Sequence, residues 1–187
     1  MIRTERRRVQ ETDLQFDCLT GPTLTKEIMT EFYQLYLDTY GRYEEQEFLT
    51  PAFFLEVQKR MPSKAMLNTV RRDGQFLAGT LLFQGDNMVF AHHWGCKEHI
   101  KFLHFETTYY KAVDYCFDHN KQAVNAGQGG NHKANRGFLP FTTYHAHWFR
   151  SQEFQNAVGR SIGKKKKMVD AEIAKSMAFS PYKDDKA

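Results

Sequence analysis

Three short apolar segments separated by two tight turns constrain the fold of this chain more than any other feature. The segments are 65–72, 75–84 and 88–94, and the turns are Asp73-Gly74 and Gly85-Asp86-Asn87. Turns of two or three residues join strands that are antiparallel neighbours. The sequence therefore predicts a three-stranded antiparallel meander.

The segment after the meander predicts a crossover connection. Apolar residues recur at helical spacing between His104 and His119, and they are Phe105, Tyr109, Ala112, Val113, Cys116 and Phe117. A short run at 122–126 is interpreted as another strand. A strand, a helix and a strand in this order form a crossover unit. The strands at 88–94 and 122–126 are therefore expected to be parallel, with a right-handed connection.

Two helices are predicted before the meander. The first begins at Thr25 and ends near Tyr40, and the second begins at Thr50-Pro51 and ends at Pro62. A capping residue followed by proline at the first helical position is typical of a helix start.

The C-terminal third has weaker signals. Residues 141–148 alternate as a strand would, 151–162 have a helical pattern, and a polar segment begins with four lysines at 164–167. We divide the chain into a basic N-terminal stub at 1–20, a folded domain at 21–163 and a polar, partly disordered tail at 164–187.

A glycine-rich loop follows the predicted crossover. Glycines let backbone N–H groups converge into a concavity that accepts anions, and nearby basic side chains add charge. The residues expected to bind a substrate or cofactor are Gln128, Gly129, Gly130, His132, Lys133 and Arg136, with Trp94 as a further candidate. Two alternatives stay open: the loop is held by its own hydrogen bonds, and Trp94 only packs.

The distribution of charge argues against a general nucleic-acid groove. The net charge is +4, with +3 from residues 1–8 and +4 from 164–167, so the rest of the chain carries −3. A groove for nucleic acid would place basic residues on the folded body. A nucleic-acid-associated module that uses the two basic segments remains an alternative.

Cysteine usage and hydropathy suggest the compartment. The cysteines are Cys18, Cys96 and Cys116, without a CxxC pair, which suits free thiols in a reducing environment. No apolar stretch approaches the roughly 20 residues of a membrane span. The N-terminal arginines are not followed by the apolar segment of a secretory signal. The expected location is cytoplasmic, without a membrane span.

Five separated motifs resemble one family in the order in which that family has them. They are GPTLTKEIMTEFYQLYLDTY, FLTPAFFLEV, HHWGC, LHFETTYYKAVDYC and AGQGGNHKANRGFLPFTTYHAHW. The chain resembles the FemAB-like predicted N-acyltransferases of the peptidoglycan biosynthesis or recognition type, from Glu5 to the SPYK near its end. Members of that family are longer, so the chain resembles their C-terminal half and is expected to be truncated.

The resemblance implies a fold and an activity. The fold is α/β (α+β) and GNAT-like, the acyl-CoA N-acyltransferase architecture, with a mixed, mostly antiparallel sheet and flanking helices. The activity is transfer of an acyl or aminoacyl group from an activated donor to a small-molecule or peptide amine. No cofactor is expected to be bound permanently, and acyl-CoA or aminoacyl-tRNA is the co-substrate. The turn at 95–103 has one glycine instead of the usual pyrophosphate signature, which keeps a tRNA partner open.

The expected catalytic residues open the crossover helix. Glu106 is assigned as base, His104 as its orienting group and Tyr109 as a donor of a proton or hydrogen bond. The alternative is that Glu106 only complements the helix dipole. The family usually has an arginine and an aromatic residue where this chain has His92 and His93.

Two further points complete the expectations. The family usually has a glutamate at the position of Asn131. A zinc site is not expected, because the histidines lack the usual spacing and cysteine support. A non-catalytic remnant or binding domain is the alternative to an enzyme.

Overall fold

The computed structural model describes residues 1–42, 47–128 and 130–182. The chain divides into two compact units, Met1–Gly127 and Gln128–Ala187, and each is described by itself.

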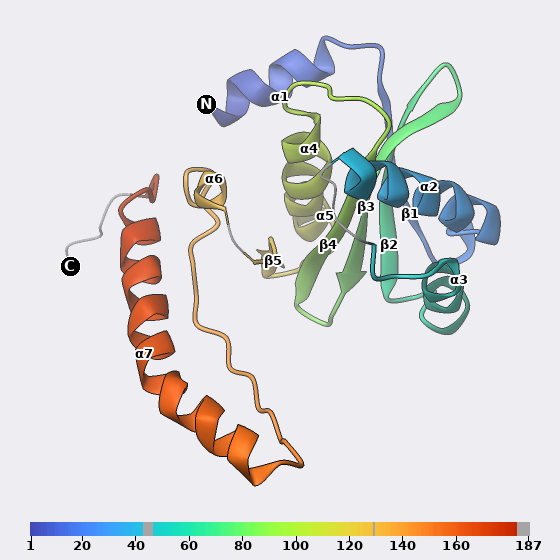
Figure 1. Ribbon diagram of the computed structural model, residues 1–187. Coiled ribbons are helices and arrows are strands. Elements are labelled where there is room, and N and C mark those ends of the chain that lie inside the picture. The colour runs from blue at the N-terminus through green and yellow to red at the C-terminus, as the bar shows by residue number, and fades with distance from the viewer. Residues whose placement is uncertain (43–46, 129, 183–187) are drawn as a thin grey trace. The chain divides into compact units, whose positions relative to one another are not determined.

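A five-stranded mixed sheet forms the centre of the first unit (Figure 1). The strands lie in sequence order and are β1 (Gln15–Thr20), β2 (Ala65–Arg72), β3 (Gln75–Gln84), β4 (Met88–Cys96) and β5 (Ala123–Asn125). Neighbours are antiparallel except β4 and β5, which are parallel. The predicted meander and parallel crossover are confirmed. Asp73 and Gly74 both have positive φ, of 50° and 75°, as a tight turn between twisted strands requires.

Helices cover both faces of this sheet. Helices α2 (Lys26–Arg42) and α3 (Pro51–Arg60) pack on one face, in a core that includes Leu67 and Leu81. A second core joins the neighbouring Met66 and Leu82 to α5 (Lys111–Asp118). Successive residues of a strand point to opposite faces, so α5 lies on the face opposite α2 and α3.

A close approach between α2 and β4 fixes these elements together. A Cβ atom on Gly95 would lie 2.6 Å from the backbone carbonyl carbon of Leu35. Only glycine allows the helix backbone this near the strand.

The predicted helix at 104–119 is one helical stretch with a wider turn inside it. It begins with α4 (Leu103–Phe105), passes through the π-helical segment η2 (Glu106–Tyr110) and continues as α5. Buried polar groups hold the wide turn to the sheet. Asn68 Nδ2 donates to the Thr107 carbonyl at 2.8 Å, and the hydroxyls of Thr80 and Thr108 are 2.8 Å apart. Wide turns of this kind are frequent at functional sites.

The structure differs from the predicted basic stub at 1–20. Residues in this segment form α1 (Ile2–Gln10) and the edge strand β1, and the short helix η1 (Gly21–Thr23) follows. Val9 is buried with Val70, Ala78 and Leu103. Helix α1 has five charged residues and few apolar residues that point inward. Its sequence pattern therefore resembles that of a solvated segment.

The second unit contains α6 (Asn131–Ala134) and α7 (Gln152–Met177). The prediction of a strand at 141–148 is wrong, because these residues lie in no helix or strand and are exposed. Alternation of side chains becomes a strand only where a partner supplies backbone hydrogen bonds. The lysines at 164–167 are inside α7 and exposed, so the predicted tail begins within a helix. Across the described part of the chain, none of the helices has the length and apolar character to cross a membrane.

Candidate active site

The pairing of β4 with β3 contains an irregularity. Leu82 of β3 is opposite Ala91, but the next residue, Leu81, is opposite His93. His92 is therefore an extra residue, as in a β-bulge, and bulges commonly redirect side chains next to active sites.

The strand pairing ends at the same place. Strand β5 pairs only with Met88–Phe90, so from Ala91 onward no strand is registered on this side of β4 in the described chain. At its far end, β4 is joined to α2, since the Cys96 N–H donates to Thr39 Oγ1 at 3.2 Å. Backbone groups at the edge of a strand that has no neighbouring strand are the kind that an extended ligand can pair with.

The bulge places both histidine rings on the face of α2 and α3. The ring centroids of His92 and His93 are 4.3 Å apart. His92 lies 5.4 Å from the ring of Phe83, and His93 lies 5.2 Å from Tyr36 and 5.9 Å from Phe48. In the sequence, these histidines stand out only as a departure from the family pattern, and they lack the spacing of a zinc site.

Burial favours the neutral form of both histidines. It lowers the pKa of His93 to about 4, with a smaller contribution from the neighbouring His92. Burial also lowers the pKa of His92, whose residue is nevertheless exposed. Removal from water disfavours a cationic imidazole. Near neutral pH, the bulge therefore presents two uncharged imidazoles.

Three predicted site residues come together on the opposite face. Trp94 packs in the core with Leu103, and its ring centroid lies 5.2 Å from that of His104. The His104 ring in turn lies 5.3 Å from that of Tyr109, which is buried. The three rings form a continuous aromatic contact beneath β4, and their predicted catalytic and binding roles stay predictions.

Glu106 is buried and paired with an arginine that sequence reasoning did not assign to any site. It is 2% exposed, and Arg6 Nη2 of α1 donates to its Oε1 at 3.1 Å. Burial raises the pKa of Glu106, and the attraction of Arg6 opposes that effect. Its Oε2 is buried without a hydrogen-bond partner in the residues that the structure describes. This carboxylate connects α1 to the crossover helix, and its role as a base stays a prediction.

The Arg6 guanidinium also binds Asp114 through two hydrogen bonds of 3.0 and 2.5 Å. The hydrogen bond to Asp114 is the main cause that raises the pKa of Arg6. One arginine therefore links two carboxylates of the crossover helix. Its signal in the sequence was a single arginine among four in an apparently solvated segment.

The glycine-rich loop belongs to the second unit. Lys133 Nζ donates to the Gln128 carbonyl at 2.9 Å, and Arg136 Nη1 donates to the His132 carbonyl at 2.8 Å. Gly130 has φ of 89°, and a Cβ atom there would lie 2.5 Å from the His132 ring. The loop thus makes several of its own hydrogen bonds, while anion binding by its side chains stays a prediction.

Burial affects the charges of this loop. Burial lowers the pKa of Lys133. Burial is also the main cause that lowers the pKa of His132, and the neighbouring charges of Lys133 and Arg136 lower it further. Gly129 lies outside the described residues.

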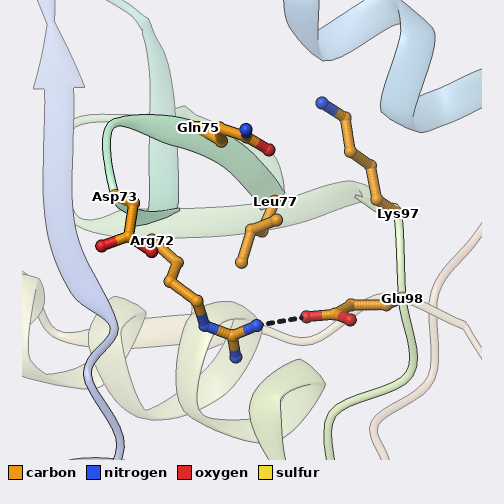
Figure 2. Close-up of a pocket in the computed structure, with 6 residues that line it drawn as sticks. All are labelled: Arg72, Asp73, Gln75, Leu77, Lys97 and Glu98. Carbon is orange, nitrogen blue, oxygen red and sulfur yellow. Dashed lines mark hydrogen bonds and ion pairs between the residues drawn. The ribbon is translucent and has the colours of Figure 1, made fainter.

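A polar cavity of about 450 Å³ lies near the turn between β2 and β3 (Figure 2). Its lining residues are Arg72, Asp73, Gln75, Leu77, Lys97 and Glu98. Arg72 is paired with Glu98 at 2.8 Å and with Asp13 at 3.2 Å. The charge of Arg72 is thus already balanced, which makes this cavity a poor site for an anionic donor. In the same described ranges, no group of three or more His, Cys, Asp or Glu residues is arranged to hold a metal ion.

Comparison with solved structures shows the fold. A C-terminal domain (DUF2156) from Agrobacterium fabrum assigned to lysylphosphatidylglycerol synthetase matches with a TM-score of 0.55 and 14% identity, over 68% of this chain and 40% of that one. L-PGS from Bacillus licheniformis matches with a TM-score of 0.53 and 13% identity, over 68% of this chain and 40% of that one. A possible acetyltransferase from Clostridium difficile 630 matches with a TM-score of 0.50 and 8% identity, over 75% of this chain and 99% of that one. The predicted GNAT-like fold is confirmed.

Sequence comparison places the chain in a family. The FemAB-like family model, described as peptidoglycan biosynthesis/recognition, matches residues 1–184. No curated protein matches the chain.

Proposed function

This chain belongs to the FemAB-like family, and we propose that it is an N-acyltransferase domain. It transfers an acyl or aminoacyl group from an activated donor to a small-molecule or peptide amine. Transfer of acyl or aminoacyl groups in general agrees with the family and with the fold. The specific donor and acceptor are part of the proposal.

One observation carries the proposal: β4 loses its partner β5 after Phe90, at the bulge that presents His92 and His93. A free strand edge can bind the amide groups of an extended donor arm by backbone hydrogen bonds. Two neutral imidazoles beside that edge suit an amine that must lose a proton before it reacts. Binding and proton-transfer groups are therefore available in one short segment.

The chemistry needs neither a metal nor a covalent nucleophile. The nitrogen of a neutral amine attacks the acyl carbonyl carbon, a C–N bond forms, and the C–S bond of a thioester or the C–O bond of an ester breaks. The leaving group takes up a proton that the nitrogen releases. Hydrogen-bond donors directed at the developing oxyanion would lower the barrier to this step.

The glycine-rich loop of the second unit is, taken by itself, a further candidate for binding an anion. Lys133 and Arg136 supply positive charge there, and each donates to a backbone carbonyl of the same loop. The Lys133 ammonium group has three N–H donors, so its contact with the Gln128 carbonyl does not exhaust them. Acyl-CoA and aminoacyl-tRNA both offer phosphates for this role.

Donor-dependent thermal stability tests the proposal. The melting temperature is compared with acetyl-CoA and with alanyl-tRNA, and desulfo-CoA and uncharged tRNA are the references. Release of free thiol or free tRNA is then followed with lysine, a lysine peptide or glucosamine as the amine acceptor. A donor at 100 times its Kd stabilises the folded state by about 2.7 kcal/mol. Lys133→Ala is expected to reduce the stabilisation, whereas Lys165→Ala, on the exposed surface of α7, retains it.

The result also separates an enzyme from a binding domain. Stabilisation and amine-dependent release of the donor's leaving group support the proposal. If neither donor stabilises the chain and neither releases its leaving group, the proposal is refuted and a non-catalytic domain is favoured.

A further inference from the structure

The histidine pair of β4 owes its arrangement to the bulge. In a regular strand, consecutive side chains point to opposite faces of the sheet. Here both rings contact aromatic residues of the same face, Phe83 and Tyr36, and their centroids are 4.3 Å apart. Two adjacent imidazoles on one face therefore depend on the extra residue, His92.

The surroundings hold one ring firmly and leave the other accessible. The N–H groups of Phe48 and Leu49 both donate to the Tyr36 hydroxyl at 3.3 Å, which brings the segment before α3 against the His93 ring. Nε2 of His93 is buried and has no hydrogen-bond partner within the described ranges. His92, by contrast, is exposed.

We propose that His92 is the general base of the transfer reaction, taking a proton from the ammonium group of the acceptor. This inference rests on the proposed function. The imidazole nitrogen gains the proton, and the freed amine attacks the acyl carbon. The C–N bond forms and the bond from the acyl carbon to the donor breaks. The second proton of the nitrogen passes to the leaving thiolate or alkoxide.

The protonation of the pair fits this assignment. Two cationic rings at this separation would repel one another, so the pair accepts one proton before a second becomes unfavourable. His92 takes that first proton, because the pKa of His93 is depressed further by burial and by His92 itself. Of the rings that contact the pair, Tyr36, Phe83 and Phe48, only Tyr36 carries an ionisable group.

Glu106 is the rival base, and its contacts argue against that role. It is 2% exposed and its Oε1 accepts a hydrogen bond from Arg6. A base must come within hydrogen-bond reach of the proton that it removes. His92 is exposed, so an acceptor can approach it without rearrangement of the core.

The test compares pH profiles of kcat/KM for the donor that the wild-type chain uses, acetyl-CoA or alanyl-tRNA, with a lysine peptide as acceptor. His92→Gln, His93→Phe, Glu106→Gln and, as a control, His119→Gln are measured beside the wild type. His92→Gln is expected to lower kcat/KM about 100- to 1,000-fold at pH 7. The deficit should shrink as the pH approaches the pKa of the lysine amine, about 10.4. Donor KM and the melting temperature should stay unchanged.

Each outcome decides the inference. A loss in His92→Gln that is equal at every pH, or a loss confined to Glu106→Gln, overturns it while leaving transferase activity established. A loss with His93→Phe but not with His92→Gln also overturns it, by assigning the proton to the other ring. A wild-type chain that transfers no acyl group from either donor refutes the proposed function and this inference together.

Discussion

Replacement of Arg6 by alanine should destabilise the first unit in a way that depends on pH. Arg6 Nη2 lies 3.1 Å from Glu106 Oε1, and the Glu106 side chain is 3% exposed. Loss of one partner from a buried ion pair costs about 3–5 kcal/mol, because the other charge stays buried without compensation. The Arg6 side chain is 28% exposed, so we expect a smaller loss, about 2–4 kcal/mol at pH 7.5.

The sign of the pH dependence follows from Glu106. Burial raises the pKa of its carboxyl in the folded state, and removal of Arg6 removes the attraction that opposes this effect. Glu106 of the folded chain then binds a proton more tightly than it does in the unfolded chain, where the pKa of a glutamate is about 4.3. Stability therefore falls as the pH rises from that value through the folded-state pKa. The deficit of Arg6→Ala should be small at pH 4.5 and largest at pH 7.5.

Urea unfolding followed by circular dichroism at the two pH values measures this deficit. The double variant Arg6→Ala/Glu106→Gln should be more stable than Arg6→Ala at pH 7.5, since it no longer buries a charge. Arg7→Ala is the matched control, because its ion pair with Glu11 is exposed and should contribute less than about 1 kcal/mol. An Arg6→Ala deficit that is the same at both pH values, or a double variant no more stable than the single one, would refute the reasoning.

Two further substitutions test the packing around the site. Gly95→Ala should destabilise the fold by about 1–3 kcal/mol, because its Cβ would overlap the backbone of Leu35. Gly159→Ala in the open surface of α7 should instead be neutral or slightly stabilising, and thermal unfolding compares the two. Asn68→Ala removes the buried hydrogen bond to the Thr107 carbonyl and should cost about 1–3 kcal/mol by urea unfolding, and an unchanged midpoint would contradict this role for the amide.

Local signals predicted the meander closely and distant partners poorly. The bounds of β2 and β3 agree with the predicted 65–72 and 75–84, because apolar runs between tight turns need no distant information. The edge strand β1 was missed, since its burial depends on pairing with β2, about fifty residues away in sequence. Residues 141–148 have the alternation of a strand but lie outside the sheet, because no strand pairs with them in the described residues.

The candidate site was harder to predict because its geometry arises from register. The sequence HHWGC implies that His92 and His93 point to opposite faces, and only the shift between Leu81 and Leu82 brings their rings together. That shift is a property of the paired strands and leaves no mark in either strand alone. The charged residues that the sequence made prominent are instead bonded within their own segments, as Lys133 is to Gln128. The proposed base therefore lies where the ladder of β4 becomes irregular, and not where polar residues are dense in the sequence.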